Sequence, residues 1–327
     1  MEIKAAVIGS GIGEKHIQAI DELKFSNVKI ICETDPKKIK ILKKKYRNKV
    51  VTHRENDIFK DSSINLVSIA SYDDFHYKQI LKCIRYNKHI IVEKPMCLKL
   101  SQLKEIKKRL SKKKKIKLFS NLVLRVNNLF LDLKKKIKSK DIYFIEADYI
   151  WGRKNKLFGW RAKTKNYSIT LGAGIHMIDL VNWLIDLKPM YANAFGSNKM
   201  TKNTTFKKNS FNVVILEYPK KILTKISSNC VAHYDHFHEL KIFTKNATYI
   251  NNLQGKFIYK DKKVIPLTRN YPDKKNRKKL IQNFIECIVK NSKKPIMQLK
   301  EQFDLMSICF AIEESLSKKR KVKINYI

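Results

Sequence analysis

The N-terminal stretch, residues 1–35, constrains the fold of this chain more than any other segment. Residues 3–8 form a short apolar run rich in Ile and Val, which predicts a strand. A glycine-rich turn, Gly-Ser-Gly-Ile-Gly at residues 9–13, follows directly, and residues 14–23 have helical spacing. A second apolar run over residues 28–32 ends in Glu33. This order of strand, glycine turn, helix, strand and acid predicts a dinucleotide-binding unit.

Each part of this unit has a physical role toward a dinucleotide. Gly9, Gly11 and Gly13, with Ile12 between them, let the backbone approach a pyrophosphate at the helix N-terminus. Glu33 follows Gly9 by 24 positions, close to the spacing of an acid that binds the adenosine ribose. The spacing is G-x-G-x-G rather than G-x-G-x-x-G, so the triplet alone would also fit a structural turn. The flanking elements favour nucleotide binding.

The acid also bears on the choice of cofactor. A carboxylate a few ångströms from a 2′-phosphate costs about 1–4 kcal/mol, depending on the local dielectric. Glu33 therefore favours NAD over NADP, although Lys37 and Lys38 soften the penalty.

Length and composition indicate a two-domain globular protein. The chain has 327 residues, 43% of them hydrophobic, and no apolar run long enough to cross a bilayer. A strand that begins at residue 3 leaves no room for a signal peptide. The six cysteines contain no C-x-x-C pair. We therefore expect a cytoplasmic protein with reduced thiols, no membrane segment and no zinc site.

The formal net charge of +41 raises the question of nucleic-acid binding. Of the 70 basic residues only 10 are Arg, and the Lys excess is spread along the chain. Nucleic-acid sites favour the bidentate fork of Arg. We expect no specific nucleic-acid role; attraction of anionic substrates is a simpler consequence of the same field.

Further strands alternate with helices up to residue 124. Residues 64–70, 89–92 and 116–124 are apolar runs, and the alternation predicts a doubly wound parallel sheet with helices on both faces. Ligands bind beyond the carboxyl ends of such strands. Ser71, His76 and Glu93 fall there, and we expect them to line the cofactor site with the glycine turn.

The second half has a different pattern. Four segments predict strands joined by short turns, and thus a largely antiparallel open sheet: residues 142–150, 211–218, 222–228 and 240–244. One helix, residues 175–184, interrupts them. The change in composition near Asn121 predicts an α/β protein with a dinucleotide-binding domain at 1–121 and a second domain at 122–327.

Lys94 is the first candidate for chemistry. It lies between Glu93 and Pro95 directly after a strand, and Pro95 disfavours the helical region for it. A lysine held at a strand end can donate to a substrate oxygen and polarise it. The alternative is one surface lysine among many.

Four segments together carry a resemblance to a known family. They are the glycine turn continuing to His16, Asp73-Asp74-Phe75-His76, Glu93-Lys94-Pro95, and the run from Gly172-Ala173-Gly174-Ile175-His176 to Asp179. The chain resembles the Gfo/Idh/MocA oxidoreductases, named for glucose–fructose oxidoreductase and inositol dehydrogenase, over essentially its whole length. The loops are similar to a branch that handles sugars in surface-polysaccharide pathways.

The resemblance implies an NAD-binding Rossmann domain at 1–121 and a nicotinamide cofactor. The same resemblance implies a substrate-binding and oligomerisation domain at 122–327, an α/β domain whose sheet face makes dimer or tetramer contacts. It also implies Lys94 and His176 at the reacting carbon of a sugar or nucleotide sugar. His176 would exchange the hydroxyl proton, and Lys94 would hold and polarise the same oxygen. Asp179 would orient the substrate or the imidazole. Without the family, a histidine such as His176 on an amphipathic helix is more often a core residue than a catalytic one, and the resemblance reverses that expectation.

The chain departs from the family at Gly172, where many members carry an Asp four residues before the histidine. The substrate contact of that acid must come from elsewhere or be absent. Tyr167 and Ser168 are nearby candidates, as are Trp160 and Arg161.

Three histidines at 233, 236 and 238 suggest a metal site at first sight. Their spacing does not bring three ligands together on a helix, and on a strand only His236 and His238 share a face. We expect a polar strand end that lines the substrate site, or a plain sheet surface, and no metal.

Three functions are compatible with these features. The first is an NAD-dependent dehydrogenase acting on a sugar or nucleotide sugar. The second uses tightly held NAD for transient oxidation in epimerisation, elimination or glycoside cleavage. The third is a non-catalytic NAD-binding regulator, which the loss of the acid at Gly172 makes plausible.

Overall fold

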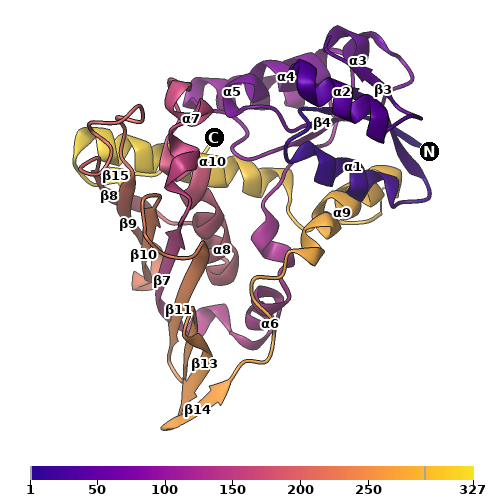
Figure 1. Cartoon of the computed structure of the whole chain (residues 1–327). Coiled ribbons are helices and arrows are strands. Elements are labelled where there is room, and N and C mark those ends of the chain that lie inside the picture. Colours follow the sequence, from indigo (N-terminus) through magenta and orange to yellow (C-terminus); the bar gives the residue numbers. More distant parts are fainter. Residues whose placement is uncertain (1, 291) are drawn as a thin grey trace. The chain divides into compact units, whose positions relative to one another are not determined.

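The computed structural model describes residues 2–290 and 292–327 (Figure 1). The chain divides into two compact units. The first contains Met1–Asn121 and Lys275–Gln302, and the second contains Leu122–Lys274 and Phe303–Ile327. Each unit is built around one sheet.

The first unit has a six-stranded sheet in the order β3-β2-β1-β4-β5-β6, with every pair parallel. This is the strand order of dinucleotide-binding folds, so the predicted Rossmann sheet is confirmed. The strands are β1 (Ile3–Ile8), β2 (Ser26–Cys32), β3 (Val50–Thr52), β4 (Leu66–Ile69), β5 (His89–Val92) and β6 (Leu118–Ser120). The helices between them are α1 (Gly13–Asp21), α2 (Pro36–Lys45), α3 (Asn56–Lys60), α4 (Asp73–Arg85) and α5 (Leu100–Ser111).

A further helix of this unit, α9 (Lys278–Val289), comes from late in the sequence. It packs beside α1, and Figure 1 shows the orange helix next to the indigo one. The Gln282 amide donates to the Ala19 carbonyl oxygen at 3.3 Å, and Lys278 forms an ion pair with Glu22 at 2.7 Å. Residues 275–302 thus lie in the first unit, whereas the sequence analysis assigned them to the substrate domain.

The second unit contains a nine-stranded sheet in the order β14-β13-β12-β11-β7-β10-β9-β8-β15. All pairs are antiparallel except β7 with β10, which agrees with the largely antiparallel sheet predicted. Its strands are β7 (Ile142–Ile150), β8 (Tyr191–Ser197), β9 (Phe211–Glu217), β10 (Leu223–Asn229), β11 (Phe237–Thr244), β12 (Thr248–Asn252), β13 (Gly255–Lys260), β14 (Lys263–Pro266) and β15 (Val322–Lys323).

Helix α8 (Ile175–Ile185) packs on β7 and β10 and covers one face of this sheet. In β7, which α8 contacts, residues alternate between buried and half-buried from Ile145 to Ile150. The remaining helices are α6 (Asn128–Lys136), α7 (Trp160–Lys163) and α10 (Leu299–Lys318). Short helical turns complete the chain at Val123–Val126 (η1), Ser139–Asp141 (η2), Lys154–Leu157 (η3), Thr170–Gly174 (η4), Pro219–Lys221 (η5) and Lys275–Arg277 (η6).

One predicted strand is much shorter than expected. Residues 116–124 form a strand only over β6, and the chain then enters the 3₁₀ turn η1. Leu122 and Leu124, beyond the end of β6, are also buried. The apolar sequence pattern therefore continues past the strand and made the predicted strand too long.

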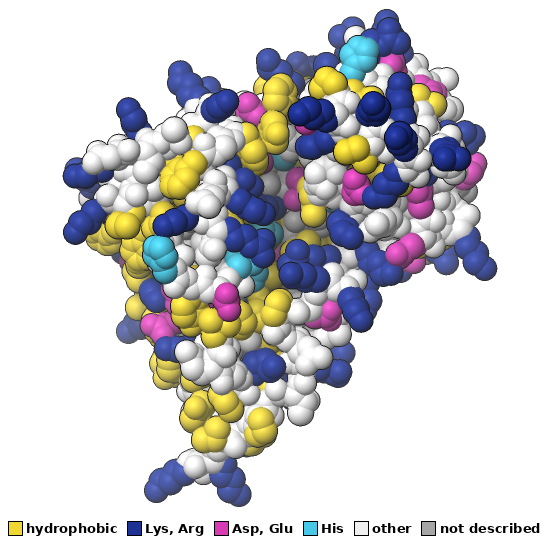
Figure 2. Space-filling view, viewed as in Figure 1, with side chains coloured by type: hydrophobic (Ala, Val, Ile, Leu, Met, Phe, Trp, Pro, Cys, Tyr) yellow, Lys and Arg dark blue, Asp and Glu magenta, His cyan; other side chains and the backbone are white. Residues whose placement is uncertain are grey.

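Lys and Arg side chains are spread over the visible face of each unit, with Asp and Glu between them (Figure 2). None of the helices formed by residues 2–290 and 292–327 is long and apolar enough to cross a membrane. All six cysteines are buried, and none of them forms a disulfide within the described residues.

Candidate active site

The glycine turn between β1 and α1 brings open backbone to a helix N-terminus. Gly9 has φ +88°, and a Cβ there would lie 2.5 Å from the Ala70 carbonyl oxygen, so only glycine fits. A Cβ on Gly11 would meet no atom within 4 Å. Gly13 begins α1, and Ile12 beside it is 46% exposed. The open backbone at Gly11 fits the pyrophosphate of a dinucleotide.

Glu33 follows β2 and is buried beside this turn. Its Oε2 accepts from the Ser10 backbone N at 3.0 Å and from the Ser10 hydroxyl. Its Oε1 accepts from the backbone N of Thr34 at 2.8 Å and of Asp35 at 3.1 Å. Burial favours the neutral acid, but the hydrogen bonds from Ser10 and the backbone outweigh it and lower the pKa of Glu33. Four donors fill the acceptor sites of the carboxylate, so a ribose hydroxyl would have to share an oxygen already in use.

A buried polar network joins α1 to the ends of β5 and β6. The ring of His16, 1% exposed, contacts Ser68 Oγ through Nδ1 at 2.7 Å and Glu93 Oε1 through Nε2 at 2.9 Å. The Asn121 amide donates to the same Glu93 oxygen at 2.7 Å. Burial opposes ionisation, but contacts with His16, Asn121 and the charge of Lys94 hold the pKa of Glu93 at about 2. Glu93 is therefore a fixed anion that anchors the loop carrying Lys94.

A second contact holds the same loop from α4. The His76 ring is fully buried; Nδ1 lies 2.8 Å from the Pro95 carbonyl oxygen and Nε2 lies 3.1 Å from that of Ser71. The Ser71 hydroxyl donates to Gln79 at 2.6 Å. We predicted that Ser71 and His76 line the cofactor site. The structure shows His76 tying together the loops that follow β4 and β5.

In the second unit, His176 lies in a cluster of rings. It is on α8 and 9% exposed, and the Tyr149 ring stacks on it with 6.0 Å between centroids and 9° between planes. Register pairs Tyr149 of β7 with His238 of β11, whose rings are 4.9 Å apart. His236 lies 5.0 Å from His238 and 5.4 Å from Tyr149. The hydroxyl of Tyr271 bonds Nδ1 of His238.

This cluster contains two of the three histidines at 233, 236 and 238. His236 and His238 share a face as predicted, and that face is the one with Tyr149 and His176. Within residues 2–290 and 292–327, no group of three His, Cys, Asp or Glu side chains is arranged to hold a metal ion.

Asp179 is almost fully enclosed, one turn after His176. Arg125 of η1 binds its carboxylate, with Nε 3.1 Å from both oxygens and the terminal nitrogen 2.7 Å from Oδ1. The two side chains are 4% and 1% exposed. This bidentate pair gives Asp179 a position-holding role between α8 and η1. The catalytic role that the resemblance implies for it stays a prediction.

The helical turn before α8 explains the glycine at 172. A Cβ on Gly172 would lie 2.1 Å from the Tyr167 hydroxyl oxygen, so the phenol occupies the space beside this backbone. Tyr167 is 2% exposed and contacts the rings of Trp160 and Phe206 edge-on. The turn itself is π-helical, a form often found at functional sites.

Arg161, the other substrate candidate, lies among aromatic rings. Its guanidinium is 4.3 Å from the Trp160 ring centroid, 5.1 Å from Trp151 and 5.9 Å from Tyr167. It also donates to the Lys156 carbonyl oxygen at 3.2 Å.

The predicted residues thus lie in two groups, one in each unit. In the first unit, the glycine turn, Glu33, Glu93 and His76 meet at the carboxyl ends of β1, β2, β4 and β5. In the second, His176 meets Tyr149, His236 and His238. Lys94 and His176 belong to different units, and their meeting at one substrate stays a prediction.

Sequence reasoning missed Tyr149, Arg125 and the contact made by Asn121. Tyr149 and His238 both lie on the buried side of their strands. The alternation of apolar and polar residues along each strand could have identified that side. Only the pairing of β7 with β11 brings them together, and the two segments are about ninety positions apart in the sequence.

Both halves of the chain match one family. Residues 3–121 match its NAD-binding Rossmann domain, and residues 134–324 match its C-terminal alpha/beta domain. Among curated proteins, the NADP(+)-dependent scyllo-inositol 2-dehydrogenase IolW of Bacillus subtilis is 26% identical over 211 residues. That match covers 62% of this chain and 58% of the relative, so the chain spans little more than half of that protein.

Two solved structures are similar in fold. The myo-inositol 2-dehydrogenase of Lactobacillus plantarum has a TM-score of 0.85 and 17% identity, covering 99% of this chain and all of that one. The UDP-N-acetylglucosamine 3-dehydrogenase GnnA of Acidithiobacillus ferrooxidans has a TM-score of 0.81 and 14% identity, covering 97% and 99%. At these identities the likeness shows the fold alone. With both domain models matched along nearly its whole length, the chain belongs to the Gfo/Idh/MocA oxidoreductase family.

Proposed function

We propose that this protein is a nicotinamide-dependent dehydrogenase that interconverts a secondary alcohol and a ketone on a sugar or nucleotide sugar. The observation that carries the proposal is the loop after β5. Glu93, with a pKa of about 2, and the buried His76 hold this loop from two sides, and Lys94 lies between their anchoring points. A lysine fixed in this way near the glycine turn is prepared to act on a substrate oxygen.

Each residue has a defined task in this reaction. When bound, the nicotinamide accepts or returns the hydride. Lys94 donates a hydrogen bond to the reacting oxygen and stabilises negative charge that develops on it. His176 takes the hydroxyl proton during oxidation and returns it during reduction. The Tyr149 ring stacked on His176 keeps the imidazole in one plane, and the Arg125–Asp179 pair fixes α8 beneath it.

We infer a preference for NAD over NADP from Glu33. The lowered pKa keeps this carboxylate charged, and a second anion at the 2′ position of the ribose would be repelled. Titration of NAD and NADP against the purified protein tests this preference; tighter binding of NADP, the cofactor named for the Bacillus relative, would overturn it.

Two other functions are distinguished by simple measurements. Transient oxidation with tightly held NAD predicts product without net accumulation of NADH. A non-catalytic NAD-binding regulator predicts binding without turnover; Gly172, which lacks the usual acid, is the feature that favours it. We further propose a cytoplasmic setting and, by family resemblance, a place in surface-polysaccharide metabolism.

A homo-oligomer, dimer or tetramer, is proposed from the sheet of the second unit. On β9, Val213 and Ile215 point to the face opposite the buried Val214 and Leu216 and are only half-buried. Val213→Lys would place a charge on this face. We expect the mass measured by light scattering to fall to that of one chain; an unchanged mass would remove this face as the interface.

The function is tested by incubating the purified protein with NAD and a panel containing scyllo-inositol, glucose 6-phosphate and UDP-N-acetylglucosamine, followed at 340 nm. Lys94→Ala should lower kcat by about 10²–10⁴. Lys99→Ala, an exposed lysine five positions on, is the matched control and should leave kcat unchanged. Full turnover by the Lys94→Ala protein would exclude the proposed mechanism.

A further inference from the structure

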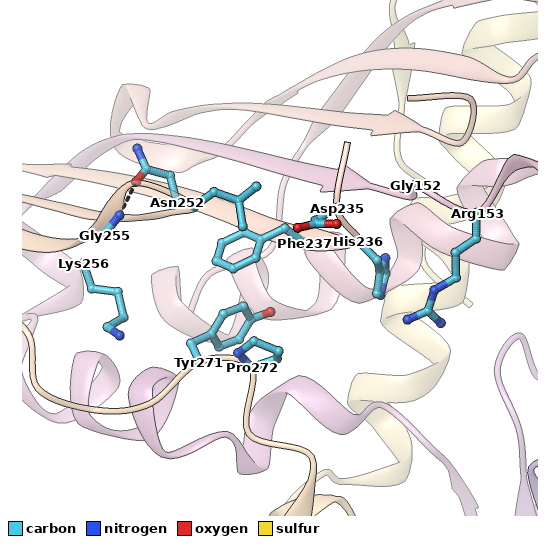
Figure 3. A pocket seen from close by; sticks show the side chains of 11 residues that line it. Gly152, Arg153, Asp235, His236, Phe237, Asn252, Gly255, Lys256, Tyr271 and Pro272 are labelled. Carbon is cyan, nitrogen blue, oxygen red and sulfur yellow. Dashed lines mark hydrogen bonds between the residues drawn. The ribbon is translucent and has the colours of Figure 1, made fainter. Parts of the chain in front are cut away.

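The open pocket of the second unit adjoins the His176 cluster and extends the candidate active site (Figure 3). Its volume is about 520 Å³, and His236 and Tyr271 are among the residues that line it. The ring centroids of His236 and Tyr149 are 5.4 Å apart, and the Tyr271 hydroxyl bonds His238 of the same cluster. A set of buried polar groups to which the proposed reaction gives no task lies instead in the first unit.

A chain of hydrogen bonds in the first unit joins the start of α3 to the loop after β4. Glu55 directly precedes α3, and its Oε1 accepts from the side-chain amide of Gln79 at 2.6 Å. The side-chain oxygen of Gln79 accepts in turn from the Ser71 hydroxyl at 2.6 Å. Lys82, three positions after Gln79 on α4, donates to the other oxygen of Glu55 at 3.0 Å. Gln79 is only 2% exposed, so the centre of this chain is shielded from water.

The carboxylate of Glu55 fixes the direction of every hydrogen bond in the chain. A carboxylate that is paired with a lysine accepts hydrogen bonds and has none to donate. The Gln79 atom that faces Glu55 must therefore be the NH2 group, and the amide oxygen must face Ser71. A serine hydroxyl has a single proton, and Ser71 donates it to that amide oxygen. Ser71 Oγ is left with its lone pairs, so it can accept a further hydrogen bond but cannot donate one.

Ser71 lies where a ligand of this sheet would meet it. It is half-buried at the carboxyl end of β4, against the glycine turn, and a Cβ on Gly9 would lie 2.9 Å from the Ser71 backbone N. Ligands of parallel sheets bind beyond this edge. Nε2 of His76 lies 3.1 Å from the Ser71 carbonyl oxygen, so the backbone of Ser71 is held as well as its hydroxyl.

An oxygen that can only accept discriminates between the parts of a dinucleotide. Pyrophosphate oxygens carry no proton at neutral pH, and two acceptors that face each other form no hydrogen bond. Ribose hydroxyls and the carboxamide NH2 group do carry protons that they can donate. The direction of the chain therefore excludes a contact of the Ser71 hydroxyl with the pyrophosphate and favours one of these donors.

We propose that Gln79 and Glu55 are positioning residues that make the Ser71 hydroxyl an acceptor for a hydroxyl or amide donor of the bound nucleotide. The inference rests on the proposed function, because the ligand is the cofactor of that reaction. Ser71 makes the contact, whereas Gln79 and Glu55 act only through Ser71. A ribose hydroxyl and the carboxamide share the required chemistry, and the test separates them.

Glu55→Gln should reverse the chain rather than only weaken it. The introduced amide would direct its oxygen to the Lys82 ammonium group, which leaves its NH2 group facing Gln79. The Gln79 amide would then turn over and present its own NH2 group to Ser71. The Ser71 hydroxyl would accept inside the chain and present its proton to the ligand, so that a donor would face a donor.

The test is a calorimetric titration of NAD, and of ADP-ribose, which lacks the nicotinamide, into the purified protein without substrate. Ser71→Ala and Glu55→Gln should each lower the affinity for NAD about 3- to 10-fold. The double variant should bind as weakly as Ser71→Ala alone, because Glu55 acts through Ser71. Lys82→Met is the control: Glu55 stays an acceptor, so the affinity should stay within about twofold of wild type.

The two charge changes separate this proposal from a plain electrostatic effect. Glu55→Gln removes an anion near an anionic ligand, and Lys82→Met removes a cation. Charge alone would therefore tighten binding in Glu55→Gln and loosen it in Lys82→Met, the reverse of the expected order.

The nucleotide that is affected identifies the donor. Equal losses for NAD and ADP-ribose in Ser71→Ala would assign a ribose hydroxyl, and a loss for NAD alone would assign the carboxamide. Wild-type affinity in Ser71→Ala, wild-type or tighter affinity in Glu55→Gln, or additive losses in the double variant would overturn the inference.

The binding readout also separates the inference from the proposed function. If the expected pattern of affinities is found in a protein that oxidises no substrate, the proposed function fails and the role of Ser71 stands. If substrate is oxidised but Ser71→Ala binds NAD as wild type does, only the inference fails. A wild-type protein that binds neither nucleotide would overturn both.

Discussion

The two units prepare their functional side chains in different ways. In the first, polar groups are saturated by hydrogen bonds: Glu33 accepts four, and Glu93 is held by His16 and Asn121. In the second, His176 lies among ring faces, and the Arg125–Asp179 ion pair is buried one turn away on the same helix. A network in which every polar group is hydrogen-bonded holds the backbone of a cofactor site in one conformation. Aromatic rings beside an open pocket instead leave space that a particular substrate can fill.

The buried pair in the second unit should show the largest effect on stability. Arg125→Met leaves the Asp179 carboxylate enclosed without its guanidinium, which costs about 3–5 kcal/mol. Arg269→Met breaks a pair with Asp132 in which the arginine is 57% exposed, and should cost at most about 1 kcal/mol. All three tryptophans lie in this unit, so urea unfolding followed by their fluorescence reports on it directly. Similar losses in both variants would mean that the buried pair does not hold α8.

The network of the first unit should give a pH dependence that can be traced to one carboxylate, Glu93. The pKa of Glu93 is about 2 when folded and near 4.5 otherwise, so its charge stabilises the fold above pH 4.5. That stabilisation, about 3 kcal/mol, is lost as pH falls from 4.5 toward 2. Glu93→Gln should flatten this part of the profile, measured by circular dichroism of urea unfolding at several pH values. Glu105→Gln, which removes an exposed partner of Arg109, is the control and should keep the wild-type profile.

The same contrast explains how far the sequence could predict this molecule. In the first unit, Gly9, Glu33 and Glu93 follow strands directly, and parallel strands bring their carboxyl ends to one edge whatever their order. Local motifs therefore predicted which residues gather there. The donors that saturate Glu33 and Glu93 could not be predicted, because Ser10 and Asn121 reach them only through the details of backbone turns.

In the second unit the sequence predicted strands but not their neighbours. The cluster around His176 depends on β7 lying between β11 and β10, an order that no local pattern encodes. Gly172 was recognised as a departure from the family. The reason for the glycine is the close approach of the Tyr167 side chain, which depends on how the chain turns between the two residues and could not be predicted. The helix α9 was predicted in position and yet joins the first unit, since its apolar face fits α1.

Two glycines test the difference between a packed and an open turn. Gly172→Ala brings a methyl group 2.1 Å from the Tyr167 hydroxyl, and the rings of Trp160 and Phe206 hold that phenol in place. We expect a loss of about 1–3 kcal/mol in urea unfolding. Gly11→Ala meets no atom within 4 Å and should change stability by less than about 0.5 kcal/mol, but weaken NAD binding measured by calorimetry. Undiminished NAD affinity in Gly11→Ala would exclude this turn as the pyrophosphate site.

The hydroxyl of Ser10 is expected to contribute a small part of the stability of the first unit. Ser10→Ala removes one of four donors to Glu33 but keeps the backbone N–H on the same oxygen, so the loss should be about 1 kcal/mol. Because this donor helps to lower the pKa of Glu33, the pKa should rise in the variant. The stability that the Glu33 carboxylate contributes is then lost at a higher pH during acid unfolding than in wild type. The variant also frees one acceptor site on the Glu33 carboxylate. NAD affinity should therefore hold or improve if the ribose uses this oxygen. A marked loss of NAD affinity would instead mean that the hydroxyl itself contacts the cofactor and that the saturated network is part of the binding site.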